Sequence, residues 1–516
     1  MNASTERAPR TIPDRLPEVV TVVSGDNADA QRISRLHRAG LLRPLYRGVY
    51  SSNLRADDED VVLRNWRLIL AYLAPGAVIS HRSAVDMKPA TGTLWISRSN
   101  GSRELELPGL KFKGMVRPER GAIVHAARDG ARDVDYRGIY VASTARAYLE
   151  SLTADKRLAP RQLGREEIEN ALERILTLRG EPGLNNFRDD ARDVAHHLKM
   201  PAEFKVLDGL TGALLGSHPV KNLGSARAVA RARGQPYDAE RIELFDRVAA
   251  QLRAFPFSDL AEPARQGAAR NMFAFVEGYF SNYIEGTTFT LEEAEEIVFQ
   301  GRLVLNRDED SHDIKGTFEA AQRDPFYSQL PADPAGFLQW LQGANSLVMQ
   351  ARLDRNPGQW KDKNNQAGSS LFVPPELVPE TLRRAWLLFD TLAHPMQQAL
   401  MAMFVVSEIH PFADGNGRTA RLMMNCFLSA QAHCRIIVPT VFRDDYLLSL
   451  KSLTNEGDAT AYIRALRLCQ AWSFQLSFDV AFEKMNEQLE TTNAKREEAR
   501  LYRLLSPSTG RPMSVP

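Results

Sequence analysis

The chain has 516 residues, 44% hydrophobic and 25% charged, so we expect a globular protein with two to four domains, each with its own core. Its 65 basic and 64 acidic residues give a formal net charge of +1, which excludes a uniformly basic nucleic-acid coat and leaves only local basic clusters. No stretch approaches the roughly 18 uninterrupted apolar residues of a membrane span, and the start lacks the apolar core of a signal peptide, which together predict a cytoplasmic protein.

The first predicted unit, residues 1–55, contains a basic stretch, QRISRLHRAGLLRPLYRGVYSSNLR, that has several arginines and no acid. Three of these arginines fall on one face of a plausible helix, and LYRGVYSS is typical of two short strands. A helix followed by a β-hairpin predicts a winged helix-turn-helix that contacts DNA phosphates; the alternative is an ordinary solvated face. The arginines expected at the DNA are Arg32, Arg35, Arg38 and Arg47.

The next stretch, residues 56–160, predicts a small mixed α/β domain. Short β-branched or aromatic runs such as LWISRS and IYVAS alternate there with Gly, Pro and charged turns. Residues 161–229 predict a helical linker region, in which LRGEPGLNNFRDDARD and LDGLTGALLGSHP suit a linker or connecting loops. GLTGALLG lacks the Gly-Lys-Ser/Thr of a phosphate-binding loop, so we do not assign it one.

Three segments of this N-terminal part, RAGLLRPLYRGVY, VISHRSAVDM and YVASTARAYLESL, occur in the order found in AbiEi-like antitoxins and transcriptional regulators. The resemblance implies a winged helix followed by a mixed α/β domain, which together repress their own operon. It implies no catalytic residues. The first helix of the winged unit is not clear in EVVTVVSGDNADA.

Residues 230–485 have apolar residues at helical spacing and predict an all-helical domain, and residues 486–516 predict a flexible tail. The three cysteines, Cys426, Cys434 and Cys469, are too widely spaced for a disulfide framework or zinc site, and we expect them to pack as small apolar side chains.

The segment HPFADGNGR, residues 410–418, concentrates polar groups between two predicted helices. MQQALMAMFVVSEI runs into His410, which precedes a proline and therefore should end the first helix; RTARLMMNCFLSA starts the second. Backbone N–H groups of a glycine loop at a helix N-terminus form an anion site. Taken singly, the histidine could be a packed residue and DGNG a turn.

Each polar residue of this loop suits one part of polyphosphate chemistry. His410 is a general base at neutral pH, and Asp414 is a ligand for Mg²⁺ beside a polyphosphate. Arg418 and Arg421 are three apart, share a helix face and can pair with further phosphate oxygens. The loop residues expected to hold phosphate are Gly415, Asn416 and Gly417.

Residues 410–421 match HPFx(D/E)GNGRxxR, and the chain is identified as resembling the Fic family over roughly residues 230–480. The resemblance implies that AMP is transferred from ATP to a Ser, Thr or Tyr hydroxyl of a protein and that pyrophosphate leaves. It assigns the hydroxyl proton to His410, magnesium to Asp414, the α-phosphate to Asn416 and the loop amides, and the β- and γ-phosphates to the two arginines. Family members that phosphorylate have a lysine in place of Gly417, so kinase activity is disfavoured; UMP or phosphocholine transfer stays open.

The segment GYFSNYIEGTTFTLEEA resembles the inhibitory helix of this family, with Ser281, Glu285 and Gly286 at its Ser/Thr-x-x-x-Glu-Gly/Asn positions. Glu285 lies one helical turn from Ser281 and could form a bidentate ion pair with an arginine, by resemblance Arg421. The alternative is a surface acid followed by a helix-ending glycine. GQWKDKNNQAGSSLFVPPELVP resembles the flap that docks the target as an added strand, expected over residues 361–368; a plain loop is the alternative.

The predicted fold class is therefore multidomain: a winged helix-turn-helix, a small mixed α/β domain, then an all-α Fic domain with a short β-hairpin flap. Two functions are consistent with it. One is a self-inhibited protein adenylyltransferase that uses ATP and Mg²⁺, modifies a protein or itself, and carries a DNA-binding module. The other is a DNA-binding repressor whose Fic part is a nucleotide sensor or scaffold. A Fic enzyme that mainly removes AMP, and a homodimer, are left open.

Overall fold

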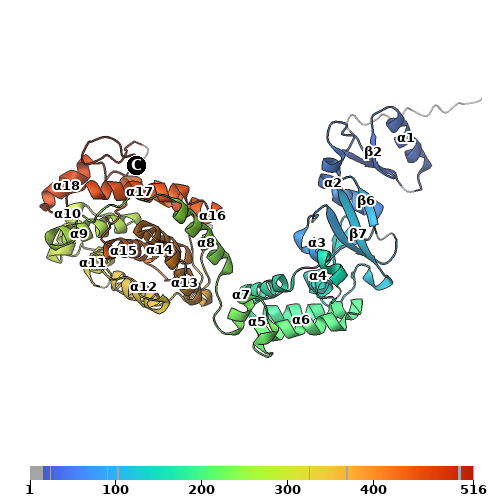
Figure 1. Ribbon diagram of the computed structural model, residues 1–516, viewed down its shortest axis with the longest axis horizontal. Coiled ribbons are helices and arrows are strands. Elements are labelled where there is room, and N and C mark those ends of the chain that lie inside the picture. The colour runs from blue at the N-terminus through green and yellow to red at the C-terminus, as the bar shows by residue number, and fades with distance from the viewer. Residues whose placement is uncertain are drawn as a thin grey trace, which may run out of the picture. The chain divides into compact units, whose positions relative to one another are not determined.

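The structure is a computed structural model that describes residues 16–23, 25–89, 91–101, 104–154, 156–324, 326–367, 370–497 and 501–514. The chain forms two compact units, Met1–Gly234 and Gln235–Pro516, each with its own elements (Figure 1).

The N-terminal unit begins with a three-stranded antiparallel sheet in the order β1-β3-β2 and one helix. The elements are β1 (Val19–Thr21), α1 (Asn27–Arg38), β2 (Arg43–Tyr46) and β3 (Val49–Ser51). The Asp26 side chain caps α1 by accepting the N–H groups of Ala28 and Asp29. The predicted helix and hairpin are present, but the VVT segment before them is a strand. The described residues therefore show one helix ahead of the hairpin, and the winged helix-turn-helix is not confirmed.

A six-stranded mixed sheet follows, with strand order β6-β7-β5-β4-β9-β8. Strand pairs β4/β9 and β5/β7 are parallel, and the other neighbours are antiparallel. Helix α2 buries Trp66 and Ile69 with Leu94 and Phe112 of the sheet. The mixed α and β character expected for residues 56–160 is present. The elements are α2 (Asp58–Leu73), β4 (Val78–Ile79), α3 (His81–Asp86), β5 (Thr93–Arg98), β6 (Glu104–Leu107), β7 (Leu110–Val116), β8 (Val134–Tyr136), β9 (Ile139–Val141) and α4 (Thr144–Ser151).

Helices α5 (Arg165–Leu198), α6 (Pro201–Leu214) and α7 (Ala226–Ala232) complete the unit. They pack with α4 around a core that includes Leu172, Leu184 and Leu207. The expectation of linker or connecting loops is wrong for LRGEPGLNNFRDDARD and most of LDGLTGALLGSHP, because they lie within α5 and α6. Gly180, with φ of 65° and ψ of −175°, is not helical itself and divides α5 into two helical segments at a kink.

The C-terminal unit is helical, and α14 and α15 lie at its centre with α9, α11, α12 and α13 around them (Figure 1). Its described helices are α8 (Ala239–Ala254), α9 (Gly267–Ile284), α10 (Leu291–Gln300), α11 (Asp308–Gln322), α12 (Pro334–Val348), α13 (Val378–Trp386), α14 (Pro395–Ile409), α15 (Asn416–Ala430), α16 (Arg443–Glu456), α17 (Thr460–Gln475) and α18 (Phe482–Thr491).

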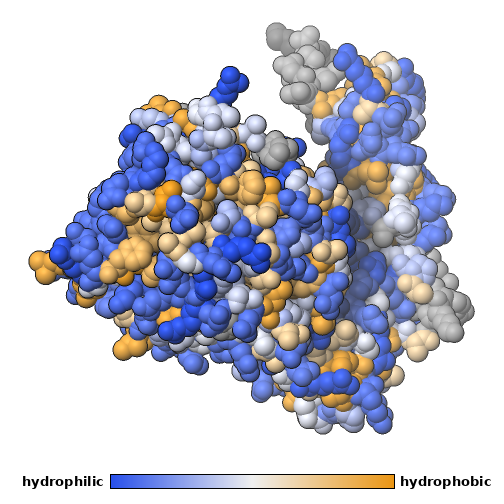
Figure 2. Space-filling view, turned by 60° about the vertical axis from the view of Figure 1, so that its left-hand side comes forward, coloured by the Kyte–Doolittle hydropathy of each residue, from blue (hydrophilic) through white to orange (hydrophobic). Residues whose placement is uncertain are grey.

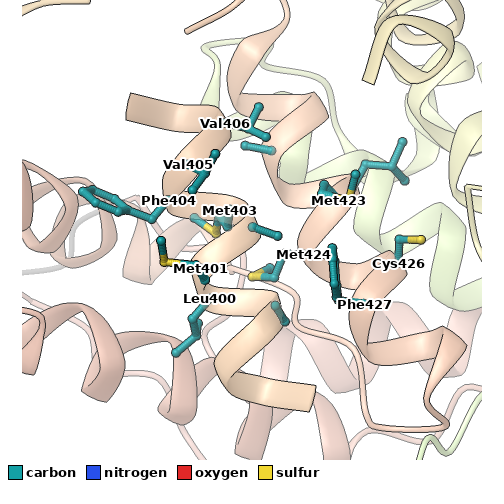
Figure 3. Close-up of a cluster of buried hydrophobic side chains, with 14 of the residues drawn as sticks. Leu400, Met401, Met403, Phe404, Val405, Val406, Met423, Met424, Cys426 and Phe427 are labelled. Atoms are coloured by element: carbon teal, nitrogen blue, oxygen red, sulfur yellow. The ribbon is translucent and has the colours of Figure 1, made fainter. Parts of the chain in front are cut away.

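Apolar side chains join α14 to α15 and fix the two helix ends that carry the polar loop between them. Met424 points from α15 toward α14, whereas Phe404 points away from α15 (Figure 3). Both residues are fully buried, as are Met403 and Met423. Because burial of each such side chain contributes roughly 1.5–3 kcal/mol, the helix pair is a rigid base for the loop.

The end of the chain differs from the flexible tail expected after residue 485. Helix α18 continues to Thr491, and Leu504 is buried in the core beneath α9. The hydroxyl of Ser506 donates to Gln475 Oε1 at 2.6 Å, and that of Ser508 donates to the same oxygen at 2.8 Å. Residues 498–500 and 515–516 lie outside the described chain.

The three cysteines are buried and not in disulfides, as the sequence predicted. Among the described residues no helix is both long and apolar enough to cross a bilayer. Figure 2 shows hydrophilic residues over most of the visible surface, with hydrophobic residues scattered between them.

Candidate active site

The loop between α14 and α15 has the conformation that its sequence demands. His410 ends α14 in the left-handed region, with φ of 53°, and Gly415 starts α15 with φ of 74°. The Asn416 side chain closes the loop: its Oδ1 accepts the Phe412 N–H at 2.9 Å, and its Nδ2 donates to the Phe412 carbonyl at 2.9 Å. The sequence predicts that Asn416 and the loop amides hold a phosphate. The Asn416 side chain is engaged within the loop, so only the Asn416 backbone N–H remains for an anion.

The His410 imidazole is oriented as a base. Its Nδ1 lies 3.2 Å from the Ser407 carbonyl, which places the proton on Nδ1 and leaves the Nε2 lone pair free. The ring stacks on Phe372 with centroids 3.8 Å apart and planes 5° from parallel. Burial lowers the pKa of His410 to about 4. The ring is therefore neutral, and able to accept a proton, throughout the physiological range.

The N-terminus of α15 is an open anion site. Within the described part of the chain no side chain caps this end, so the N–H groups of its first turn keep their hydrogen-bonding capacity. A Cβ on Gly417 would lie 2.2 Å from Glu285 Oε1, so glycine makes room for the carboxylate. The absence of a side chain at Gly417 thus leaves space beside the start of α15, which the Glu285 carboxylate occupies here.

Asp414 has the properties of a cation ligand at the edge of this anion site. One carboxylate oxygen accepts the Gly415 N–H at 2.6 Å, and the side chain is 42% exposed. No hydrogen bond from the described residues reaches its second oxygen. A single partly exposed carboxylate beside a phosphate site fits Mg²⁺, which takes one or two carboxylates and completes its shell with phosphate and water.

Arg421 meets the end of α9, as the sequence predicted. Its Nη2 is 2.6 Å from Glu285 Oε1 and donates to the Ser281 carbonyl at 2.8 Å, and its Nε donates to Ser281 Oγ at 3.0 Å. The pair is not the bidentate one expected, because Ser281 takes two of the guanidinium hydrogens. Gly286, with φ of 99°, ends the turn.

The Arg421–Glu285 ion pair is asymmetric in its exposure. The Arg421 side chain is 6% exposed and that of Glu285 is 37% exposed. Partial burial alone would raise the pKa of Glu285, but the charge and hydrogen bond of Arg421 outweigh it and hold that pKa below its ordinary value. Glu285 is therefore ionised at neutral pH and negatively charged at the entrance to the anion site.

Arg418 does not stand beside Arg421 as a free phosphate ligand. Its Nη1 is 2.7 Å from Asp313 Oδ2 on α11 and 3.3 Å from Asn282 Oδ1 on α9, and its side chain is 5% exposed. The expectation that it holds phosphate is not met in this conformation, because its guanidinium is paired with Asp313 inside the protein, although its Nε has no hydrogen-bond partner among the described residues. Sequence reasoning missed Asp313, since an acid more than 100 positions away carries no local signal.

A cavity of about 360 Å³ opens on these groups, which is within the range of ligand pockets. His410, Gly417, Arg421 and Glu285 line one part of it. The remainder is mostly apolar, with a buried carboxylate, Glu408, that accepts the Thr454 hydroxyl at 2.6 Å. Its residues are Glu285, Leu371, Phe372, Phe404, Ser407, Glu408, His410, Gly417, Arg421, Tyr446, Leu447, Leu450, Lys451 and Thr454.

The predicted flap is a short hairpin. Strands β10 (Gln366–Ala367) and β11 (Ser370–Leu371) pair antiparallel, with Gln366 opposite Leu371. Gly368, in the stretch expected as the flap, lies outside the described residues. Phe372 directly follows β11 and covers the His410 ring, so the flap borders this histidine.

One cluster elsewhere in this unit has metal-ligand residue types: Asp259, His394 and His433. The His394 Nδ1 accepts the Met396 N–H at 3.0 Å, so the proton of a neutral ring is on Nε2, which points at Asp259 Oδ1 3.2 Å away. Because His394 Nδ1 already accepts the Met396 N–H, only one of its ring nitrogens faces Asp259, and that nitrogen is within ion-pair distance of the carboxylate without forming a hydrogen bond.

The four arginines predicted to contact DNA belong to the N-terminal unit, and all are exposed: Arg32, Arg35, Arg38 and Arg47. Arg32 forms an ion pair with Asp29 at 2.9 Å, which reduces the local excess of positive charge.

Comparison with known proteins identifies the class of the catalytic part. Residues 337–428 match the Fic/DOC family model, so the chain contains a Fic/DOC family domain. Similar curated proteins are the protein adenylyltransferase Fic of Drosophila erecta, 31% identical over 162 residues (30% of this chain, 32% of that one), and of Drosophila mojavensis, 42% identical over 76 residues (15% of each). The chain thus spans about a third or less of their length.

A solved structure of Fic-1 from C. elegans is 20% identical and aligns with a TM-score of 0.34, covering 64% of this chain and 96% of that one.

Proposed function

We propose that the C-terminal unit is a self-inhibited protein adenylyltransferase, which moves AMP from ATP to a hydroxyl of a protein, this chain included. One observation carries the proposal: the unprotonated Nε2 of His410, the uncapped start of α15 and Arg421 all face one cavity. Glu285 is ion-paired with that arginine at the same place. The names of the similar curated proteins, protein adenylyltransferase Fic, support the same reaction.

The proposed reaction is an in-line displacement at the α-phosphorus. His410 Nε2 accepts the proton of the attacking hydroxyl, the hydroxyl oxygen bonds to the α-phosphorus, and the bond to the α–β bridging oxygen breaks. The electron pair leaves on pyrophosphate. The N–H groups at the start of α15 receive the charge that develops on the α-phosphate. Mg²⁺, held by Asp414, would neutralise the leaving phosphates.

Self-inhibition follows from the contacts of Arg421. Its guanidinium is engaged by Glu285 and Ser281, so a terminal phosphate must displace a carboxylate to reach it. The ionised Glu285 also repels the triphosphate. Removal of Glu285 frees the cation and removes the repulsion, whereas Ser281 can stay.

The test is transfer of label to protein from α-labelled ATP with Mg²⁺. We expect Glu285→Gly to raise transfer about 5–150-fold, the range of typical coupling free energies. In the Glu285→Gly background, His410→Ala should abolish AMP transfer. The control in the same background is Glu292→Gly, which removes an exposed acid of α10 and should leave the rate of transfer unchanged. Label from the γ-position would instead indicate a kinase. If Glu285→Gly transfers no AMP but the unchanged chain removes AMP from a modified protein, the reverse reaction is the main one.

A second candidate function, DNA binding by the N-terminal unit, is supported by the four exposed arginines and by the AbiEi-like segments. A gel shift on the gene's own upstream DNA should weaken when Arg35 and Arg38 are replaced by alanine. Binding should also fall steeply with salt, because phosphate contacts release counterions. DNA binding without any AMP transfer by Glu285→Gly would favour a repressor whose Fic part is a sensor or scaffold.

A further inference from the structure

Lys361, at the base of the flap, is a buried lysine without an acidic partner. It is 5% exposed, and no carboxylate of the described residues lies within ion-pair distance of its ammonium. Its Nζ donates instead to Asn365 Oδ1 at 2.6 Å and to the Ile409 carbonyl at 3.3 Å. Lysine is almost never fully buried unless paired, so this position has a cost that calls for a compensating role.

The contacts of Lys361 connect the flap to the catalytic loop. The Lys361 backbone N–H donates to the Pro411 carbonyl at 2.9 Å. Asn365, whose Oδ1 accepts the hydrogen bond from Lys361 Nζ, donates through Nδ2 to the Phe412 carbonyl at 3.0 Å. Trp360 stacks on Phe412 with centroids 5.1 Å apart. Three of the four backbone carbonyls from residue 409 to residue 412, all except that of His410, therefore accept hydrogen bonds from the flap side.

The same contacts fix the ring that covers His410. The Phe372 N–H donates to the Asn365 carbonyl at 3.3 Å, and the Phe372 ring lies on the imidazole. The Ile409 carbonyl is at the negative end of α14, where a cation is favoured. The Lys361 Nζ at this point thus attaches the flap to the helix end that presents the histidine.

We propose that Lys361 is a positioning residue for the transfer reaction: the two hydrogen bonds of its Nζ fasten the flap to the loop that carries His410 and keep Phe372 over that histidine. The inference deepens the proposed adenylyltransferase function and rests on it.

The Lys361 Nζ also makes this attachment depend on pH. Burial lowers the pKa of Lys361 to about 7. The charged groups that act on His410 are Lys361, which lowers its pKa, and Glu285 and Asp414, which raise it. Because burial lowers this pKa, the attached flap favours the neutral amine, which keeps two N–H donors for Asn365 and the Ile409 carbonyl, so the attachment tightens as pH rises through about 7 and loosens as pH falls below it.

The first experiment measures kcat/KM for AMP transfer between about pH 5.5 and 9 in the Glu285→Gly background. We expect activity to rise as pH increases through about 7. Lys361→Arg, which stays charged, should remove this rise, and Lys361→Met should lower activity about tenfold at pH 8 and also lack the rise. Lys363→Met, two residues away and exposed, is the matched control and should keep the profile. A rise near pH 7 that persists in Lys361→Arg would overturn the proposal.

The second experiment does not need activity. Hydrogen exchange of the backbone amides of residues 361–367 and 370–372, measured at one pH near 8, should be at least about tenfold faster in Lys361→Met than in Lys363→Met, because the flap loses its attachment. Equal exchange in the two variants would refute the attachment. If the Glu285→Gly parent transfers nothing while exchange does respond to Lys361→Met, the proposed reaction fails and the flap attachment stands.

Discussion

Each unit of the molecule contains a buried arginine paired with carboxylates, and the two pairs differ in what surrounds them. Arg146 in the N-terminal unit is 0% exposed and contacts Asp133 at 2.5 Å and Glu150 at 3.2 Å, which are 0% and 1% exposed. Its remaining hydrogens go to the carbonyls of Gly121 and Arg120. Arg421 in the C-terminal unit is similarly buried, but Glu285 is 37% exposed and both line a cavity.

The difference separates a structural ion pair from a displaceable one. If a ligand displaced either carboxylate from Arg146, that carboxylate would remain buried and lose its shortest contact with a cation, which costs several kcal/mol. If a phosphate displaces Glu285 from Arg421, the partly exposed Glu285 carboxylate can turn into water and lose little free energy. Burial by itself lowers the pKa of an arginine, yet the neighbouring carboxylates raise the pKa of both Arg146 and Arg421. The two ion pairs are therefore distinguished by the exposure of the carboxylate, and not by the charge of the arginine.

The largest effect that tests this comparison is on stability. Arg146→Ala leaves Asp133 buried without its cation and Glu150 with only Arg120, 3.4 Å away, and should lower the free energy of unfolding of the N-terminal unit by about 3–5 kcal/mol. Native-state hydrogen exchange of helix α4 in the full chain measures it. Glu285→Gly, followed through α9 in the same way, should cost no more than about 1 kcal/mol, because its partner lies at a cavity. Equal losses for the two variants would erase the distinction.

A second effect concerns acid. His81 is 1% exposed, and burial lowers its pKa to about 4 from an ordinary 6.5. Between these values the unfolded chain binds a proton that the folded unit does not, so stability is full above pH 6.5 and falls as pH decreases toward 4. The loss is about 3 kcal/mol at 1.36 kcal/mol per pKa unit.

His81→Asn should remove most of this acid dependence, and asparagine tolerates the φ of 52° found at this position. Denaturant unfolding of the variant and the unchanged chain at about pH 7 and 4.5 makes the comparison, with exchange in α3 and α4 reporting on the N-terminal unit. A variant that loses as much stability in acid as the unchanged chain would show that other groups dominate.

The smallest effect sharpens the contrast between stability and function in the C-terminal unit. Lys361→Met replaces a buried, unpaired ammonium with an apolar chain of similar length and should raise the free energy of unfolding by about 1–2 kcal/mol at pH 7. Because the pKa of Lys361 is lowered from 10.5 to about 7, the cost of the charge grows as pH falls from 10.5 to 7 and the gain should shrink at higher pH. Lys363→Met should change stability little at any pH. Destabilisation by Lys361→Met would mean that its two hydrogen bonds outweigh its desolvation.

The sequence by itself determined the features that depend on neighbouring residues. Pro411 disfavours helix for His410, and Gly415 supplies a positive φ, so the helix end and the start of α15 follow from a few adjacent positions. The spacing of Ser281 and Glu285 placed them on one side of α9, and the motif resemblance identified Arg421 as their partner.

Only the tertiary structure decided the features that depend on which distant segments pack together. Asp313 takes the guanidinium of Arg418, the flap lysine reaches the Ile409 carbonyl, and the last residues cover the core beneath α9. Residues 181–193 are helical despite a proline and a glycine, because burial of residues such as Leu184 and Phe187 outweighs weak local propensity, whereas Gly180 forms a kink. Local preferences act over a few residues, whereas these partners lie tens to more than 100 positions apart and meet only when the helices have packed.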